Sequence, residues 1–383
     1  MSSAARTGDL TAEFTRIYRQ PPRVTASAPG RVNLIGEHTD YNGGFVLPTA
    51  IPQRTVVALA ASGDDHVRAW SGNLNERSAS GAYTLGHEAR TGRWIDYVQG
   101  CTQALRLDGH HLRGFNLVIA SAVPLGSGLS SSAALEVAVI RGLRDLFSLT
   151  LGDVRLAQLG QRAENDFVGA PVGIMDQMAA SLADEHRALF LDTRTLQCET
   201  VALPPAAALV VVNSGVSHSH ASGDYRTRRA ECERAAALLG VAQLRDLGVN
   251  DLARVDALAD PWNRRAKHVI TENQRVLDAV AAMKAGDAVT LGRLFDESHA
   301  SQRDDYDVSV PEVDQLVEVT RAEAGVYGAR LTGGGFGGSI VALVVAGDEA
   351  RIAAQAAEAY RRKSGKQPTV LVPQQAESPE RTR

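Results

Sequence analysis

Val123-Pro124-Leu125-Gly126-Ser127-Gly128-Leu129-Ser130-Ser131-Ser132-Ala133-Ala134 is the stretch that decides the fold of this chain. It follows residues 115–122, where large apolar residues alternate with smaller or polar ones, a pattern that predicts a strand. After it, residues 134–147 are apolar around most of a helical circumference, which predicts a buried helix. The stretch therefore predicts a strand, a glycine- and serine-rich loop, and the start of a core helix.

This loop has the composition of an anion site. Its glycines allow the backbone to approach a ligand closely, and its serines place hydroxyls where a helix begins. The free N–H groups and the dipole of a helix N-terminus favour negative charge, so the loop suits a phosphate. An ordinary turn in which a serine caps the helix remains the alternative.

The bulk composition is that of a soluble globular protein. The chain has 383 residues, of which 44% are hydrophobic and 22% charged, with a formal net charge of −4. This charge offers no basic surface for nucleic acid or an anionic membrane, and no run is long enough to span a bilayer. Three widely spaced cysteines favour a reducing, cytoplasmic setting. We expect a small-molecule substrate; the oligomeric state cannot be inferred, and we expect a monomer.

Strands and helices alternate without regular βα spacing, which predicts an α+β fold. Pro204-Pro205 cannot continue a helix or a central strand, so the main boundary is expected there. The predicted organisation is an N-terminal helix and lead-in (1–22), an N-terminal domain (23–203), a C-terminal domain (206–373) and a disordered tail (374–383).

Two common nucleotide motifs do not fit. Gly333, Gly335 and Gly338 match the spacing of the dinucleotide fingerprint, but that motif needs a helix after it. Here a run of Ile, Val and Leu follows, which predicts a strand. Gly365-Lys366 is followed by Gln367 and lacks the upstream glycine of a P-loop. A nucleoside triphosphate would have to bind through another loop.

Several blocks along the chain resemble the galactokinase family within the GHMP kinases, which are small-molecule kinases. Residues 124–134 resemble the family's ATP-binding motif, and residues 331–339 its glycine-rich third motif. Residues 30–44 (Gly-Arg-Val-Asn-Leu-Ile-Gly-Glu-His-Thr-Asp-Tyr-Asn-Gly-Gly) are similar to the galactokinase signature. Further matches are Gly173-Ile174-Met175-Asp176-Gln177, Val212-Asn213-Ser214, and Tyr225 before Arg228-Arg229-Ala230-Glu231-Cys232.

The resemblance implies a GHMP kinase fold of two α+β domains with the active site in the cleft between them. It implies transfer of the γ-phosphate of ATP, with Mg²⁺, to the C1 hydroxyl of α-D-galactose. The products would be galactose 1-phosphate and ADP, at the entry to galactose catabolism (the Leloir pathway).

The resemblance also implies the catalytic residues. Asp176 would face the anomeric hydroxyl as a base or an electrostatic anchor, and Arg31 would keep it ionised and offset charge on the phosphoryl group. The residues alone favour a helix N-cap for Asp176, and Arg31 could be a surface ion-pair partner.

Ser132 and Glu164 match the residues that hold Mg²⁺ in the family, and a hard cation with few protein ligands plus phosphate oxygens suits this pair. Glu164 comes at the end of a predicted helix, where an acid is mildly unfavourable, although a solvated helix-end acid remains the alternative.

Binding residues are implied in the same way. The sugar contacts would be Glu37, His38, Thr39, Asp40, Gly173 and Tyr225. The ATP contacts would be Gly126, Ser127, Gly128, Leu129, Ser130, Ser131, Ser132 and, near the adenine, Trp94. His38 and Trp94 could also be ordinary core residues.

Two other functions stay open. One is a kinase for a related sugar, such as N-acetylgalactosamine or arabinose. The other is a non-catalytic transducer that binds galactose and ATP; Ser132-Ala133, which such transducers lack, favours the enzyme.

Overall fold

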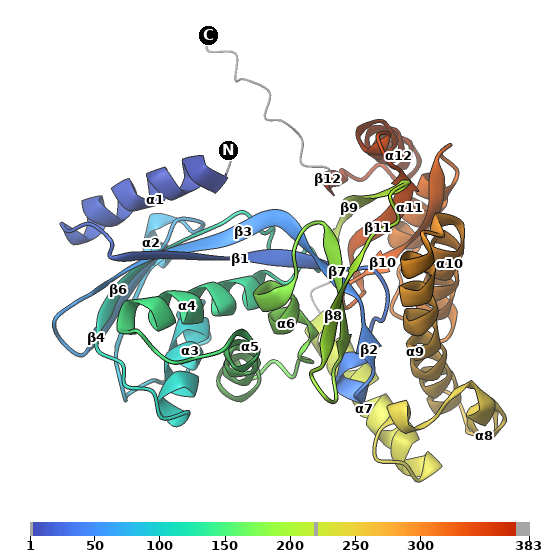
Figure 1. Cartoon of the computed structure of the whole chain (residues 1–383), viewed down its shortest axis with the longest axis horizontal. Coiled ribbons are helices and arrows are strands. Elements are labelled where there is room, and N and C mark those ends of the chain that lie inside the picture. Colours follow the sequence, from blue (N-terminus) through green and yellow to red (C-terminus); the bar gives the residue numbers. More distant parts are fainter. Residues whose placement is uncertain (1–2, 218–220, 373–383) are drawn as a thin grey trace. The chain divides into compact units, whose positions relative to one another are not determined.

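The computed structural model describes residues 3–217 and 221–372 (Figure 1). The tail expected to be disordered (374–383) lies outside these residues. Among the described helices, none combines the length and apolar character needed to cross a bilayer. The mixture of sheets and helices confirms the predicted α+β class.

The chain divides into two compact units, each built from separate stretches of sequence. The first unit comprises residues 1–31, 51–125 and 130–182, and the second comprises 32–50, 126–129 and 183–383. The sequence predicted a single boundary at Pro204-Pro205 instead. The difference arises because a strand at 187–192 pairs with one at 45–46 and with one at 198–202, and all three belong with the second unit.

The first unit is built on one five-stranded sheet. Its strands are β1 (Val24–Asn33), β3 (Pro48–Ala61), β6 (Phe115–Ser121), β4 (His66–Ser71) and β5 (Ser80–Thr84), in that order. Helix α1 (Ser3–Tyr18) lies along one face, where Phe14 packs on Val56 and Ala58 of β3. Val57 and Leu59 point to the opposite face. The alternation along β3 follows from the two-residue period of a strand, so both faces are buried.

The other face of this sheet is covered by helices. They are α3 (Ile95–Leu107), α4 (Ser131–Phe147), α5 (Asp153–Arg162), a π-helical turn (Ala163–Val168) and α6 (Met175–Leu182), with a short α2 (Glu76–Ala79) at the edge. Helix α4 is the core helix expected from the sequence, and Val137, Ile140 and Leu143 on it are fully buried. It begins at Ser131, three residues before the apolar pattern, so the serines form its first turn.

The second unit contains two antiparallel sheets. The larger has the order β10 (Val326–Thr332), β11 (Gly337–Val345), β9 (Ala207–Ser217), β12 (Thr369–Val372), and the smaller has β2 (Phe45–Val46), β7 (Arg187–Asp192), β8 (Cys198–Ala202). Residues 333–336 join β10 to β11. The glycine-rich motif is therefore followed by a strand, as predicted, and lacks the helix that a dinucleotide fingerprint needs.

Helices surround the larger sheet. They are α7 (Ala221–Leu239), α8 (Leu252–Asp256), α9 (Trp262–Ala285), α10 (Ala288–Asp304), α11 (Pro311–Arg321) and α12 (Glu349–Ser364), with 3-10 turns at Asp40–Asn42, Leu244–Asp246 and Val249–Asp251. Helix α10 lies unusually close to β10. A Cβ atom on Gly328 would come within 2.0 Å of the carbonyl oxygen of Gly292. Two facing glycines thus allow the backbones to touch, which brings Ser298 of α10 beside Arg330 of β10.

Candidate active site

Asp176 lies in the first turn of α6, in the first unit, and its carboxylate is held by two other segments. Arg31, near the end of β1, places Nε 2.8 Å and a terminal guanidinium nitrogen 2.6 Å from Oδ1. The Ser130 hydroxyl donates to Oδ2 at 2.5 Å. The Asp176 side chain remains 25% exposed, whereas that of Arg31 is 5% exposed. The carboxylate is therefore fixed by charge-assisted hydrogen bonds and does not act as a simple helix cap.

Trp94 stands before α3 and is held by its indole N–H, which donates to the Ser78 carbonyl at 2.8 Å. It lines a cavity of about 100 Å³ together with Leu125 and Ser131. The cavity lies within the first unit and is mostly apolar in its lining. Its position beside the first turn of α4 suits a flat apolar group attached to phosphates.

Glu164 lies in the π-helical turn and is 5% exposed. Gln177 donates to Glu164 at 2.8 Å and to the fully buried Glu136 at 2.9 Å, and the two carboxyl groups also share a hydrogen bond. Burial raises the pKa of Glu136 well above its ordinary value, with the neighbouring Glu164 adding to the shift. Burial likewise raises the pKa of Glu164, against a hydrogen bond from the Ser132 hydroxyl.

These acids fit a hard cation. Ser132 and Glu164 already lie within hydrogen-bond contact, and they offer only oxygen ligands. The amide oxygen of Gln177 is buried without a hydrogen-bond partner among the described residues. No cluster of three or more Asp, Glu, His or Cys side chains suited to a metal occurs in the part of the chain that the structure describes. An ion here would take two protein ligands and complete its shell with water or phosphate oxygens, as Mg²⁺ commonly does.

In the second unit, the first half of the serine-rich loop packs on the glycine-rich motif. A Cβ atom on Gly333 would lie 2.7 Å from the carbonyl oxygen of Gly128. The Ser339 hydroxyl donates to the Ser127 carbonyl at 2.8 Å. Gly126 and Gly128 have φ angles of 68° and 77°. Glycine adopts positive φ without strain, which explains why it occupies both positions.

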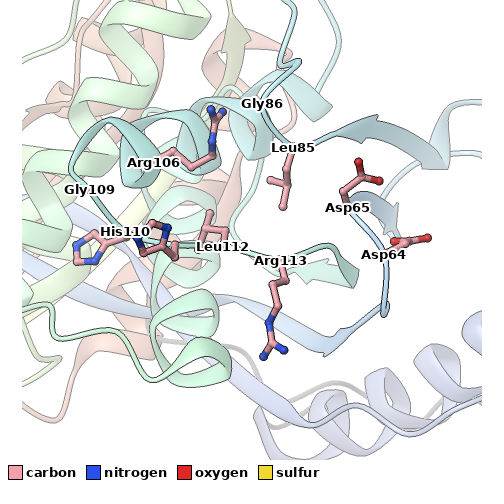
Figure 2. Close-up of a pocket in the computed structure, with 10 residues that line it drawn as sticks. Asp64, Asp65, Leu85, Gly86, Arg106, Gly109, His110, Leu112 and Arg113 are labelled. Carbon is pink, nitrogen blue, oxygen red and sulfur yellow. The ribbon is translucent and has the colours of Figure 1, made fainter.

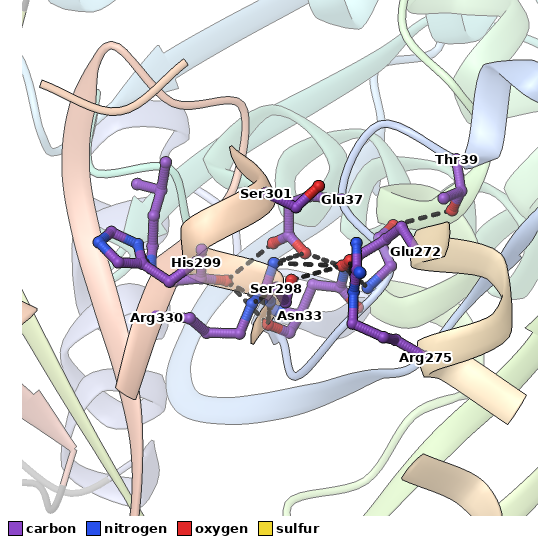
Figure 3. A network of polar contacts seen from close by, with 12 residues as sticks. Asn33, Glu37, Thr39, Glu272, Arg275, Ser298, His299, Ser301 and Arg330 are labelled. Carbon is purple, nitrogen blue, oxygen red and sulfur yellow. Dashed lines mark hydrogen bonds and ion pairs between the residues drawn. The ribbon is translucent and has the colours of Figure 1, made fainter. Parts of the chain in front are cut away.

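Residues 32–46 of the second unit, which include residues 32–44 of the signature and are called the signature segment below, are anchored through Glu37 (Figure 3). This residue is 1% exposed, and its carboxylate accepts from Arg330 at 2.6 Å, Asn33 at 2.7 Å and the Gly333 N–H at 2.8 Å. Burial raises the pKa of Glu37, while Arg330 and the Gly333 N–H oppose the shift. These three neighbours all donate, which is the arrangement that a carboxylate acceptor requires.

Arg330 is completely buried, and its donors reach several groups. Besides Glu37, they contact the carbonyls of Asn33 (3.2 Å) and Leu34 (2.9 Å) and the Ser298 hydroxyl (3.1 Å). Ser298 in turn donates to Glu272 of α9 at 2.6 Å. The arginine thus ties the signature segment to β10 and α10 (Figure 3).

Glu272 closes the same network from α9. It accepts from the Gly36 N–H at 2.9 Å and from Arg275 at 2.7 Å. Burial tends to raise its pKa, but Arg275 and Arg330 outweigh burial and lower the pKa to about 2. Glu272 is therefore a permanent anion that supports the turn at Gly36.

Other signature side chains also turn inward. The Thr39 hydroxyl lies 2.9 Å from the Gly36 carbonyl and 2.6 Å from that of Phe45. His38 is buried, with Nδ1 2.9 Å from the Tyr41 hydroxyl, and burial lowers its pKa to about 3. Its ring lies 5.4 Å from that of Tyr225, which comes from α7 and is partly exposed. Asp40 is also partly exposed.

A larger cavity, of about 480 Å³, lies elsewhere in the first unit (Figure 2). Its charged residues already have protein partners: Asp65 pairs with His66, and Arg106 pairs with Glu88 at 2.6 Å. It contains none of the residues that the sequence assigned to a site. We therefore do not take it as the active site.

Comparisons with known proteins agree with these features. Residues 12–61 match a galactokinase galactose-binding signature, 96–184 the N-terminal domain of GHMP kinases and 279–365 their C-terminal domain. A galactokinase of Roseiflexus sp. (strain RS-1) is 44% identical over 373 residues, which is 96% of this chain and 95% of the relative. The chain belongs to the galactokinase family. A Haemophilus influenzae (strain PittEE) galactokinase is 45% identical, covering 86% of this chain and 87% of its own length.

Solved structures extend the comparison. The fold matches that of a Lactococcus lactis galactokinase complexed with galactose, with a TM-score of 0.90 and 34% identity over 95% of this chain and 96% of the other. A Methanococcus jannaschii mevalonate kinase shares the fold alone, with a TM-score of 0.65 and 17% identity over 91% of this chain and 98% of the other. The predicted GHMP kinase fold is thereby confirmed.

Within the first unit, the structure brings together Asp176, Arg31 and Ser130, and separately Ser132 and Glu164. Gly173 lies three residues before Asp176, in the segment that enters α6. The sequence did not single out Glu136 or Gln177. One sequence feature could have indicated that Glu136 is a buried acid: it is a charged residue on a predicted helix that is apolar on most sides.

Arg330 and Glu272 were also missed. The partner of Arg330, Glu37, is 293 residues away in sequence, so no local pattern predicts their pairing. The signal for Arg330 was a charged residue within a strand-like run between apolar neighbours, which sequence reasoning did not use.

We expect Arg330→Met to lower the free energy of unfolding by about 3–5 kcal/mol, because it leaves Glu37 buried without its cation. Chemical denaturation measures this. The matched control is Arg321→Met, which removes a 47% exposed arginine paired with Asp296 at 2.8 Å and should cost at most about 1 kcal/mol. Equal losses in the two variants would show that the Glu37 network contributes no special stability.

The buried His268 predicts acid sensitivity. Its ring nitrogens contact Ser301 at 2.9 Å and the Glu37 carbonyl at 3.2 Å, and burial lowers its pKa to about 4. The unfolded chain takes up a proton near pH 6.5 and the folded chain does not, so stability is complete above pH 6.5 and falls as pH decreases toward 4.

Between pH 7.5 and 5.5 this one histidine should cost about 1 kcal/mol of unfolding free energy. The variant His268→Gln keeps a donor for the Glu37 carbonyl. Over this pH interval we expect its free energy of unfolding to fall by about 1 kcal/mol less than that of wild type. Gln274→Ala, at an exposed position on the same helix, is the control. A pH dependence in His268→Gln identical to that of wild type would contradict the prediction.

Proposed function

We propose that this protein transfers the γ-phosphate of ATP to the C1 hydroxyl of α-D-galactose, giving galactose 1-phosphate and ADP. The main support from the structure is the Asp176 carboxylate, fixed by Arg31 and Ser130 at the start of α4. This arrangement occurs in a chain that is 44% identical to a galactokinase over nearly its whole length.

Phosphoryl transfer depends on positioning and charge stabilisation more than on covalent chemistry by the protein. In the proposed reaction, Asp176 orients the sugar hydroxyl and draws its proton. Arg31 keeps Asp176 ionised and offsets negative charge that develops on the transferred group. The hydrogen bonds of 2.5–2.8 Å on Asp176 support this role, because they fix the carboxylate before substrate binds.

For the nucleotide, the proposal takes the loop from Gly126 to Ser132 as the phosphate cradle and the cavity beside Trp94 as the place for the adenine. Ser132 and Glu164 would hold Mg²⁺. When bound, this ion would offset phosphate charge. The buried, partnerless amide oxygen of Gln177 supports a cation here, because it is an acceptor for which no protein donor is described.

For the sugar, the proposal rests on Asp40, His38 and Tyr225, with the backbone at Gly173. Asp40 and Tyr225 are partly exposed, and the His38 ring lies 5.4 Å from that of Tyr225. Acceptors of this kind discriminate strongly between hydroxyl patterns. Glu37 and Thr39 as direct sugar contacts stay predictions. In this structure, protein donors occupy the Glu37 carboxylate, and the Thr39 hydroxyl contacts two backbone carbonyls.

We also propose that the protein acts in the cytoplasm. Cys101, Cys198 and Cys232 are all unpaired, which suits a reducing compartment.

An ADP-release assay with ATP, Mg²⁺ and a panel of sugars tests the proposed activity. We expect kcat/KM for galactose to exceed that for N-acetylgalactosamine and arabinose by at least about 100-fold, because polar contacts reject altered hydroxyl patterns. A higher kcat/KM for either other sugar would reassign the substrate. Binding of galactose and ATP without turnover would instead indicate a transducer.

Asp176→Asn tests the catalytic assignment. We expect kcat to fall by about 10²–10⁴-fold, because the amide neither draws the proton nor carries the charge. Circular dichroism and thermal unfolding verify that the variant is folded. Asp145→Asn is the matched control, since Asp145 is 51% exposed and pairs with the neighbouring Arg144. A folded Asp176→Asn enzyme with near-normal kcat would exclude the assigned role.

A further inference from the structure

Ser130 occupies the N-cap position of α4 but does not behave as a cap. Its backbone has φ 60° and ψ 49°, the left-handed region that residues with a Cβ atom avoid. An N-cap serine normally has an extended backbone and accepts a hydrogen bond from the first turn of its helix. Ser130 makes no such bond. Both its backbone and its hydroxyl therefore depart from the usual arrangement.

The hydroxyl is directed to Asp176 instead. It donates to Oδ2 at 2.5 Å, while Arg31 donates to Oδ1. The three residues come from β1, α4 and α6 of the same compact unit, and Ser130 is only 9% exposed. Asp176 is thus clamped at both oxygens, by a cation on one and a neutral donor on the other.

Backbone strain gives a reason to look for function here. Glycine adopts this left-handed conformation without cost, so a glycine would make the turn easier to form. Serine adds only a hydroxyl to what glycine provides, and that hydroxyl contacts Asp176. Strained residues often occur where geometry matters for catalysis.

We propose that Ser130 is a positioning residue that fixes the Asp176 carboxylate in its reactive orientation. The inference rests on the catalytic role proposed for Asp176. It differs from the assignment of Ser130 to the phosphates of ATP, because the side chain acts through the carboxylate and the reacting sugar hydroxyl. Loss of this hydroxyl leaves Asp176 held at Oδ1 alone, which loosens the orientation of Oδ2 and weakens catalysis without weakening ATP binding.

Two substitutions separate the hydroxyl from the strain. Ser130→Ala removes the hydroxyl and keeps the strained backbone, whereas Ser130→Gly removes both. We expect kcat to fall by roughly 10- to 100-fold in both variants, the range for a hydrogen bond to a charged group, while KM for ATP changes less than about threefold. Ser130→Gly should also have a higher Tm than Ser130→Ala.

The structure provides a matched control at the other end of the same helix. Ser148, the C-cap residue of α4, is also left-handed, with φ 52° and ψ 45°, and is exposed. Ser148→Gly should raise Tm by relief of the same strain and leave kcat unchanged. If Ser130 had only a structural role, Ser130→Gly would behave like Ser148→Gly. A higher Tm together with a lower kcat in Ser130→Gly alone would therefore indicate a role in catalysis.

A double-mutant cycle with Asp176→Asn tests whether Ser130 acts through Asp176. We expect Ser130→Ala to lower kcat less than about threefold in the Asp176→Asn enzyme, against at least tenfold in wild type. Additive losses would overturn the proposal, as would wild-type kcat in Ser130→Gly or a change confined to KM for ATP.

The outcomes also distinguish this proposal from the function on which it rests. Normal turnover in folded Asp176→Asn would remove the proposed role of Asp176 and the Ser130 inference with it. A large loss in Asp176→Asn with normal turnover in Ser130→Ala would overturn the Ser130 inference alone.

Discussion

A carboxylate inside a protein must be surrounded by hydrogen-bond donors, and this requirement organises both compact units. Asp176, Glu37 and Glu272 each have an arginine partner within 2.8 Å. Asp176 and Glu272 each add a serine hydroxyl, from Ser130 and Ser298. Each donor set draws on at least two secondary-structure elements. Satisfying these acids therefore also fixes the elements from which the donors come.

Glu136 and Glu164 are the exception to this pattern. Neither has an arginine partner among the described contacts, and the two acids share a single amide, that of Gln177. The π-helical turn at Ala163–Val168 places Glu164 in this position at the end of α5. A pair of acids left short of positive charge is costly to bury. Binding of the proposed cation would offset this cost.

The sequence predicted those features that depend on local pattern. Alternation and helical periodicity identified β6, α4 and β11, because the burial of one face follows directly from the spacing of apolar residues. The link between Arg31 and Asp176, 145 residues apart, came from family resemblance, since no local pattern encodes it. The strained backbone of Ser130 was not predicted, because serine is an ordinary residue at a helix start. The interleaved units and the burial of Glu37 depend on partners hundreds of residues away, such as Arg330.

The inward contacts of residues 32–46 bear on how this signature diverges during evolution. Much of its recognisable pattern consists of residues that hold the segment itself, such as Asn33, Thr39 and Gly44, whose missing side chain leaves room for Asn273 and Thr39. Mutations at such positions would be removed by selection for folding, whatever sugar the enzyme uses. Related enzymes could therefore keep the whole signature and yet exchange one sugar for another through a few outward positions such as Asp40. A match to this signature then indicates common ancestry. A change of sugar substrate would require few substitutions within it.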